Sequence, residues 1–114
     1  MNYRQGEVLI LDKKTAKKFY NIDLDNIDLK KLKVAPDNVI REGEISGHKH
    51  EIKGGQLHMF GETKDEGMVL KSNSAGSSVS HPEHSTVNVK KEPDGHVVIP
   101  QKEYDEKKEK KVKD

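Results

Sequence analysis

The chain has 114 residues, no cysteine, and 21 basic against 20 acidic side chains. This length suits one domain, and the absence of cysteine excludes disulfides and thiolate metal sites. The balanced charge argues against a general nucleic-acid-binding protein, and no apolar stretch approaches the roughly 20 residues of a membrane-spanning helix.

The N-terminal third combines one apolar run with a long polar segment. Residues 7–11 include the continuous sequence Val-Leu-Ile-Leu, which is typical of a strand buried on both faces. Residues 12–37 mix lysines and aspartates with isolated apolar side chains. We expect this segment to be a long connection lying over a barrel or sheet, in which residues 13–20 can form a turn or two of helix.

From residue 38 onward the pattern is strand, turn, strand. Gly54-Gly55 suits a two-residue hairpin turn, and Pro93-Asp94-Gly95 suits a second turn. Turn signals at this spacing predict an all-β fold, a small antiparallel β-barrel or sandwich, within a single domain over residues 1–104. The candidate strands are residues 39–40, 45–52, 56–60, 68–71, 77–80, 86–89 and 96–99.

The C-terminal residues 105–114 are almost entirely glutamate, aspartate and lysine. Beyond residue 101, only Tyr104 and Val112 can bury apolar area. We expect a charged C-terminal arm or frayed helix that becomes ordered only against a neighbour. Its removal should leave the stability of the isolated domain nearly unchanged.

Four of the six histidines lie in two tight groups. The first group is His48-Lys49-His50. Residues two apart on a strand share a face, and the charged residues between them should face water. This alternation predicts that His48, His50 and Ile52 point inward.

The second group, His81-Pro82-Glu83-His84, reads as a turn entering the strand that follows. Two imidazoles from a strand and two from this turn can complete a site for zinc or another divalent metal, with Glu83 or Glu44 adding a carboxylate. The alternative is that the four histidines bond backbone groups or lie at a subunit contact. His58 and His96 stand alone in candidate strands and are interpreted as ordinary surface or packing residues.

A partial resemblance links the His48-x-His50 pair and His84 to the cupins, small β-barrels that bind a metal inside. Cupins place a glutamate a few residues after the pair, where this chain has Gly54 and Gly55, and the Pro-x-Gly turn before their last histidine is also missing. The resemblance implies only an inner-face metal site.

A second resemblance rests on four segments in order: Gln-Gly-Glu-Val-Leu-Ile at residues 5–10, Glu-Gly-Glu-Ile-Ser-Gly-His-Lys-His at 42–50, His-x-x-His at 81–84 and Gln-Lys-Glu-Tyr at 101–104. Together they resemble a family of small uncharacterised proteins encoded in bacteriophage and bacterial genomes. The match covers under a third of the chain. It implies a phage or prophage source and no specific activity.

No complete catalytic motif accompanies these features: the sequence has no Gly-x-Ser-x-Gly, Walker-type or Gly-x-Gly-x-x-Gly pattern. We therefore predict a non-enzymatic, phage-type structural or binding module, with a virion- or capsid-associated role as the concrete version. Its expected partners are further copies of itself or phage structural proteins, in the host cytoplasm or the virion. The alternative is a cupin-like metal-binding protein, with His48, His50, His81 and His84 as ligands. This alternative includes a metal-dependent enzyme.

Overall fold

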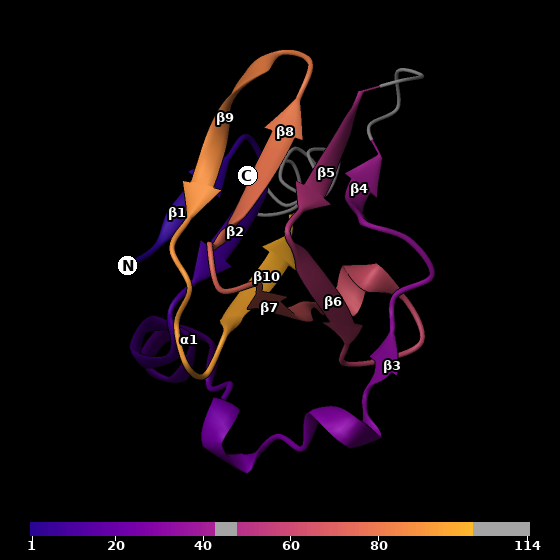
Figure 1. The fold of residues 1–114 in the computed structure, drawn as a ribbon. Coiled ribbons are helices and arrows are strands. Elements are labelled where there is room, and N and C mark those ends of the chain that lie inside the picture. The colour runs from indigo at the N-terminus through magenta and orange to yellow at the C-terminus, as the bar shows by residue number, and fades with distance from the viewer. Residues whose placement is uncertain (43–47, 102–114) are drawn as a thin grey trace, which may run out of the picture.

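The computed structural model describes residues 1–42 and 48–101, and these form a β-sandwich of two antiparallel sheets (Figure 1). The first sheet contains, in spatial order, β1 (Tyr3–Gln5), β2 (Val8–Leu11), β10 (His96–Pro100), β7 (Met68–Ser72), β6 (Gly55–Met59) and β3 (Lys33–Val34). The second contains β4 (Val39–Glu42), β5 (Lys49–Lys53), β8 (Ser77–His81) and β9 (His84–Val89). The all-β prediction is confirmed, as a sandwich and not a closed barrel. The candidate ligand Glu44 and the predicted arm 105–114 lie outside the described residues.

The main core fills the space between the two sheets. Strand alternation sends Val8 and Ile10 of β2 inward, where they meet Ile40 and Ile52 of the facing sheet. All four side chains are buried. The remaining core residues come from β6, β7 and β10 of the first sheet and β8 and β9 of the second: Leu57, Met59, Met68, Leu70, Val98, Val79 and Val89.

A second apolar cluster covers the outer face of the six-stranded sheet. Leu11, Val69 and Val97 point away from the main core and pack against side chains of the 12–37 connection, including Ala16 and Leu24. Strands β2, β7 and β10 are therefore buried on both faces, which explains their continuous apolar runs. The connection lies over the sheet as predicted.

Short helices give this connection its shape. The helix α1 (Lys13–Tyr20) has exactly the predicted bounds, and the carboxylate of Asp12 caps it by accepting from the Thr15 backbone N–H at 2.8 Å. Asn21 ends it in the left-handed conformation, at φ 56°. Two 3₁₀ turns follow in the connection, η1 (Leu24–Asn26) and η2 (Leu29–Lys31). A third, η3 (Lys64–Glu66), lies between β6 and β7 and completes the helical content of the described residues.

The prediction of a hairpin turn at Gly54-Gly55 is wrong. Strand β5 before it belongs to the four-stranded sheet and β6 after it to the six-stranded sheet, so these residues carry the chain between sheets. Gly54 has φ +81°, and a Cβ there would lie 2.9 Å from the carbonyl oxygen of Gly76. Glycine is thus required for a close backbone approach and not for a hairpin. The turn at Pro93-Asp94-Gly95 is confirmed, with the Gly95 N–H donating to the Glu92 carbonyl.

Candidate functional site at the histidine end of the sandwich

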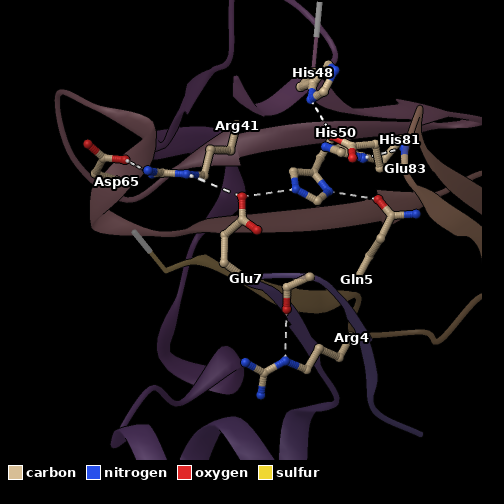
Figure 2. A network of polar contacts seen from close by, with 10 residues as sticks. Arg4, Gln5, Glu7, Arg41, His48, His50, Asp65, His81 and Glu83 are labelled. Atoms are coloured by element: carbon tan, nitrogen blue, oxygen red, sulfur yellow. Dashed lines mark hydrogen bonds and ion pairs between the residues drawn. The ribbon is translucent and has the colours of Figure 1, made fainter. Parts of the chain in front are cut away.

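Both histidine groups lie at one end of the sandwich, where three segments meet (Figure 2). These segments are the β1–β2 turn, the beginning of β5 and the β8–β9 hairpin. We call this region the histidine end, and it consists of Gln5, Gly6, Glu7, His48, His50, His81, Glu83 and His84. The two groups are more than 30 positions apart in the sequence, so the fold alone brings them together.

The four imidazole rings form one contiguous cluster. The centroid of the His81 ring lies 4.4 Å from that of His50, 4.6 Å from that of His84 and 5.9 Å from that of His48. The rings of His50 and His84 stack at 5.9 Å with an interplanar angle of 15°. His81 is therefore the central ring, in contact with each of the other three.

His50 is the buried member of the cluster, with 1% of its side chain exposed. Its Nδ1 lies 2.8 Å from Oε1 of Gln5, and its Nε2 lies 3.1 Å from Oε1 of Glu7. Both of these oxygens accept hydrogen bonds. A neutral imidazole donates from one ring nitrogen only, so His50 makes one of these hydrogen bonds when it is neutral and both when it is charged.

Gln5 holds His50 by filling a β-bulge. The register between β8 and β9 shifts between Val79 and His81, which frees backbone carbonyls from the ladder. The Gln5 Nε2 donates to two of them, the carbonyls of Val79 and Ser85, at 2.9 Å each. Because the amide nitrogen is committed to carbonyl oxygens, its Oε1 faces His50 as an acceptor.

Glu7 connects the cluster to a cation on the neighbouring strand. Its carboxylate lies 3.6 Å from Nε of Arg41 in β4, and Nη1 of Arg41 lies 3.6 Å from Asp65. Figure 2 shows the resulting chain of polar contacts from Asp65 through Arg41, Glu7 and His50 to Gln5. Each of these groups has an oppositely charged or hydrogen-bonding neighbour, which fixes its orientation.

The other histidines lie nearer the surface. Nδ1 of His48 lies 2.6 Å from the Glu83 carboxylate, and the Glu83 backbone N–H donates to Nδ1 of His81 at 3.0 Å. His48 and His81 are half-buried, whereas Glu83 and His84 are exposed. The hairpin turn thus presents a histidine and a carboxylate to solvent above the buried His50.

Gly6 makes room for His84. Gly6 lies in the β1–β2 turn at φ +56°, and a Cβ on it would lie 2.7 Å from Nε2 of His84. A side chain there would force the exposed His84 ring to shift. The glycine is required by its backbone conformation, and it leaves the space that the His84 ring occupies.

Burial and neighbouring groups shift the pKa values of His50, Glu7 and His81. Burial lowers the pKa of His50, although the Glu7 carboxylate acts in the opposite direction. Burial raises the pKa of Glu7, but its backbone hydrogen bond and the charge on His50 outweigh this, and the net pKa is lowered. Burial and then the neighbouring His84 lower the pKa of His81. Burial therefore favours the neutral forms of His50 and His81.

The predicted ligand set is brought together, but four of its ring nitrogens have protein partners: Nδ1 of His48, both nitrogens of His50 and Nδ1 of His81. Both ring nitrogens of His50 face acceptors, and Nδ1 of His81 accepts a backbone N–H. In residues 1–42 and 48–101, no group of three or more histidine, aspartate or glutamate side chains is arranged to hold a metal ion. A metal at this end would have to displace existing hydrogen bonds, and the metal site stays a prediction.

The inward orientation predicted for the first group is confirmed for His50 and Ile52, which are buried, while Lys49 between the two histidines is exposed. His48 lies before β5 and is only half-buried. The second group lies at a turn that enters a strand, as predicted: His81 ends β8, residues 82–83 form the turn and His84 begins β9. His81 and His84 are paired across this hairpin.

Sequence reasoning missed the roles of Gln5 and Glu7, although both lie in the first segment of the family resemblance. The available signal was a glycine flanked by two polar residues directly before an apolar strand. The other two histidines, His58 and His96, are both buried within the six-stranded sheet, as packing residues.

Comparison with known proteins supplies a family. A family model described as a domain of unknown function, DUF8820, matches residues 4–101. The chain belongs to the DUF8820 family. This match spans every element of the histidine end that the structure describes, and it confirms membership of an uncharacterised protein family. Neither curated proteins nor solved structures provide a match.

In the described part of this DUF8820 chain, no helix has the length and apolar character needed to cross a bilayer.

Proposed function

We propose that this chain is a non-enzymatic binding module whose partner-contacting surface is the histidine end. The concrete version is a phage-type accessory protein, associated with a virion or capsid. Its partners there are further copies of itself or phage structural proteins, and it occupies the host cytoplasm before assembly. One observation carries the proposal: a rigid, buried Gln5–His50–Glu7 unit supports an exposed imidazole and an exposed carboxylate.

Rigidity is what makes this surface suited to binding. Association costs free energy for every flexible side chain that it immobilises, about 0.5–1.5 kcal/mol each. The side chains of His48, His81 and His84 are short, and the His81 ring contacts the other two edge-on or tilted. The two glutamates of the site are held by His48 and His50. A partner that contacts this end therefore meets side chains that are already ordered.

The chemistry of the surface supports a polar or charged partner. Imidazoles donate or accept hydrogen bonds according to tautomer, and the Glu83 carboxylate accepts them. Such groups give specificity and orientation in an assembly more than raw affinity. The absence of a complete catalytic motif from the sequence is consistent with this use.

Sedimentation velocity over a range of protein concentrations tests self-association. The wild-type chain is expected to associate as its concentration rises, and His84→Ala together with Glu83→Ala should weaken association. Phe19→Ala is the matched control, because Phe19 is 69% exposed on α1 and lies outside the histidine end. A wild-type chain that stays monomeric at all concentrations would exclude self-assembly.

The phage-partner version has its own test. Purified virions from the source phage should contain the chain at a fixed ratio to the capsid protein, measured by quantitative mass spectrometry. Virions carrying the His84→Ala variant should contain less of it. If the purified virions contain none of the wild-type chain, the virion-associated role is contradicted.

A second candidate function is divalent metal binding, and the gathering of four imidazoles at one place favours it. The central His81 ring lies 4.4 Å from that of His50, 4.6 Å from that of His84 and 5.9 Å from that of His48. The rings are close together, but the nitrogens of His50 and the Nδ1 of His81 would first have to exchange their present partners. Metal analysis of the purified protein separates the two candidates.

A further inference from the structure

A surface depression lies at the other end of the β8–β9 hairpin. His81 and His84 are paired next to the turn, whereas Ser77 and Val89 are paired at the open end. At this open end the strand ends of β5, β8 and β9 surround a cavity of about 520 Å³. We call it the lysine groove, because Lys53 and Lys90 are the charged residues that line it.

The lysine groove contains no carboxylate. Its other lining residues are uncharged, among them Ser78 and Asn88. Within residues 1–42 and 48–101, neither Lys53 nor Lys90 takes part in an ion pair, whereas Lys13 and Lys64 each contact an aspartate. Two unpaired positive charges therefore face one space.

Neutral hydrogen-bonding groups accompany these charges. The Ser78 hydroxyl and the Asn88 amide make no side-chain hydrogen bond to any residue that the structure describes, and both line the cavity. Ser77, by contrast, is buried and shares a hydrogen bond of 2.7 Å with Ser72. Ser78 and Asn88 can therefore donate hydrogen bonds to a ligand, whereas the hydroxyl of the buried Ser77 is already hydrogen-bonded.

Close backbone packing fixes this floor. A Cβ on Gly76 would lie 2.7 Å from the carbonyl oxygen of Val89, and a Cβ on Gly54 would lie 2.9 Å from that of Gly76. Both glycines have positive φ, +86° and +81°. The three segments that carry the lysines and the free donors are consequently held in direct backbone contact, so their relative positions are set before a ligand arrives.

We propose that the lysine groove binds a small molecule through a phosphoryl group. A phosphate monoester carries nearly two negative charges at pH 7, which matches the two lysines. Lysine binds phosphate as a point charge, and hydroxyl and amide groups can complete the contacts to its oxygens. The cavity also falls within the roughly 300–1,000 Å³ range of small-molecule sites. This site is independent of the partner surface proposed for the histidine end.

Amide chemical shifts of the ¹⁵N-labelled full chain test the proposal, with inorganic phosphate and pyrophosphate as probes. We expect saturable shifts confined to Gly54, residues 75–78 and residues 88–90. Added potassium chloride should weaken the binding, because exposed charges are screened. Acetate at equal ionic strength should produce no saturable shift, and equal binding of acetate would overturn the assignment to phosphoryl groups.

Matched lysine variants complete the test. Lys53→Gln and Lys90→Gln should each raise the phosphate Kd about three- to fivefold, as expected for an exposed charge pair, and the double variant about tenfold. Lys14→Gln on α1 removes an exposed lysine outside the groove and should leave the Kd unchanged. Equal weakening by Lys14→Gln, or shifts spread over all lysine-rich surfaces, would show non-specific screening and overturn the proposal. His84→Ala should retain phosphate binding. The partner surface at the histidine end and the phosphate site in the lysine groove can therefore be disproved independently.

Discussion

The Oε1 of Gln5 and the Nδ1 of His50 lie 2.8 Å apart in the buried space between the two sheets. Gln5 belongs to β1 of the first sheet and His50 to β5 of the second. The same Gln5 amide donates to the carbonyl of Val79, which also belongs to the second sheet. It also donates to the carbonyl of Ser85 in β9, so one side chain bonds the first sheet to three strands of the other.

Replacing Gln5 with leucine should destabilise the fold. The Val79 carbonyl and the His50 Nδ1 would lose their partner while staying buried, and each unsatisfied buried group costs about 1–3 kcal/mol. Urea unfolding measures the loss. Gln56→Leu is the control, since Gln56 is exposed in β6. Similar free energies of unfolding for the two variants would show that the Gln5 bonds contribute little.

Replacing Gly6 with alanine should both strain the turn and displace His84. Alanine at φ +56° is strained, and its Cβ would meet Nε2 of His84 at 2.7 Å. Asn21→Ala is a matched control, because Asn21 is exposed and has the same φ of 56° without such a contact. Thermal unfolding should show a larger loss for Gly6→Ala, and the His84 ring signals should shift only in that variant. Equal losses would mean that the ring moves aside at no cost.

Local patterns were sufficient to predict the elements that depend on nearby residues. The apolar run of β2, the bounds of α1 and the inward orientation of His50 follow from periodicity within a few positions. The same reasoning failed at Gly54-Gly55, because a pair of glycines serves equally for a hairpin and for a crossing between sheets. Only the pairing of strands distant in sequence decides between them.

The histidines of the candidate site were predicted from the sequence, but the contacts that hold them were not. Histidine groups are visible in the sequence, whereas Gln5 lies 45 positions from His50 and bonds a bulge that no local pattern reveals. The pairing of His81 with His84 likewise depends on the β8–β9 register. Polar residues that act through long-range contacts are therefore the part of the site that sequence reasoning misses.

The folded chain should lose stability in mild acid. His96 is fully buried, neither of its ring nitrogens makes a hydrogen bond within the described residues, and burial lowers its pKa from 6.5. Burial likewise lowers the pKa values of His50 and His58. The unfolded chain then binds protons near pH 6.5 that the folded chain binds only at lower pH. Stability is therefore full above about pH 6.5 and falls as the pH drops below it.

Urea unfolding between neutral pH and pH 5 measures this dependence. His96→Leu should reduce the loss of stability in acid, because a titrating group is removed from the buried site. Gln56→Leu introduces the same side chain on the surface and should leave the pH dependence unchanged. A wild-type free energy of unfolding that stays constant down to pH 5 would contradict the prediction.

The last prediction concerns metal binding at the histidine end. If His48, His50, His81 and His84 hold a divalent ion, the folded state gains free energy that the unfolded chain largely lacks. At a free metal concentration of a hundred times the Kd, this gain is about 2.7 kcal/mol. Added Zn²⁺ should then raise the Tm, and a chelator should reverse the increase. Acid should act like the chelator, because a protonated imidazole cannot ligate a metal.

Two variants on β9 separate ligation from packing. His84→Ala should abolish the response to Zn²⁺ and chelator, whereas Thr86→Ala, at an exposed position two residues along the same strand, should retain it. If the histidines serve only as hydrogen-bonding and packing groups, Zn²⁺ and chelator will leave the Tm unchanged. In that case His50→Ala will still destabilise the fold by about 1–3 kcal/mol, because it leaves the buried Gln5 acceptor without its donor. The present engagement of both His50 nitrogens by Gln5 and Glu7 favours this second outcome.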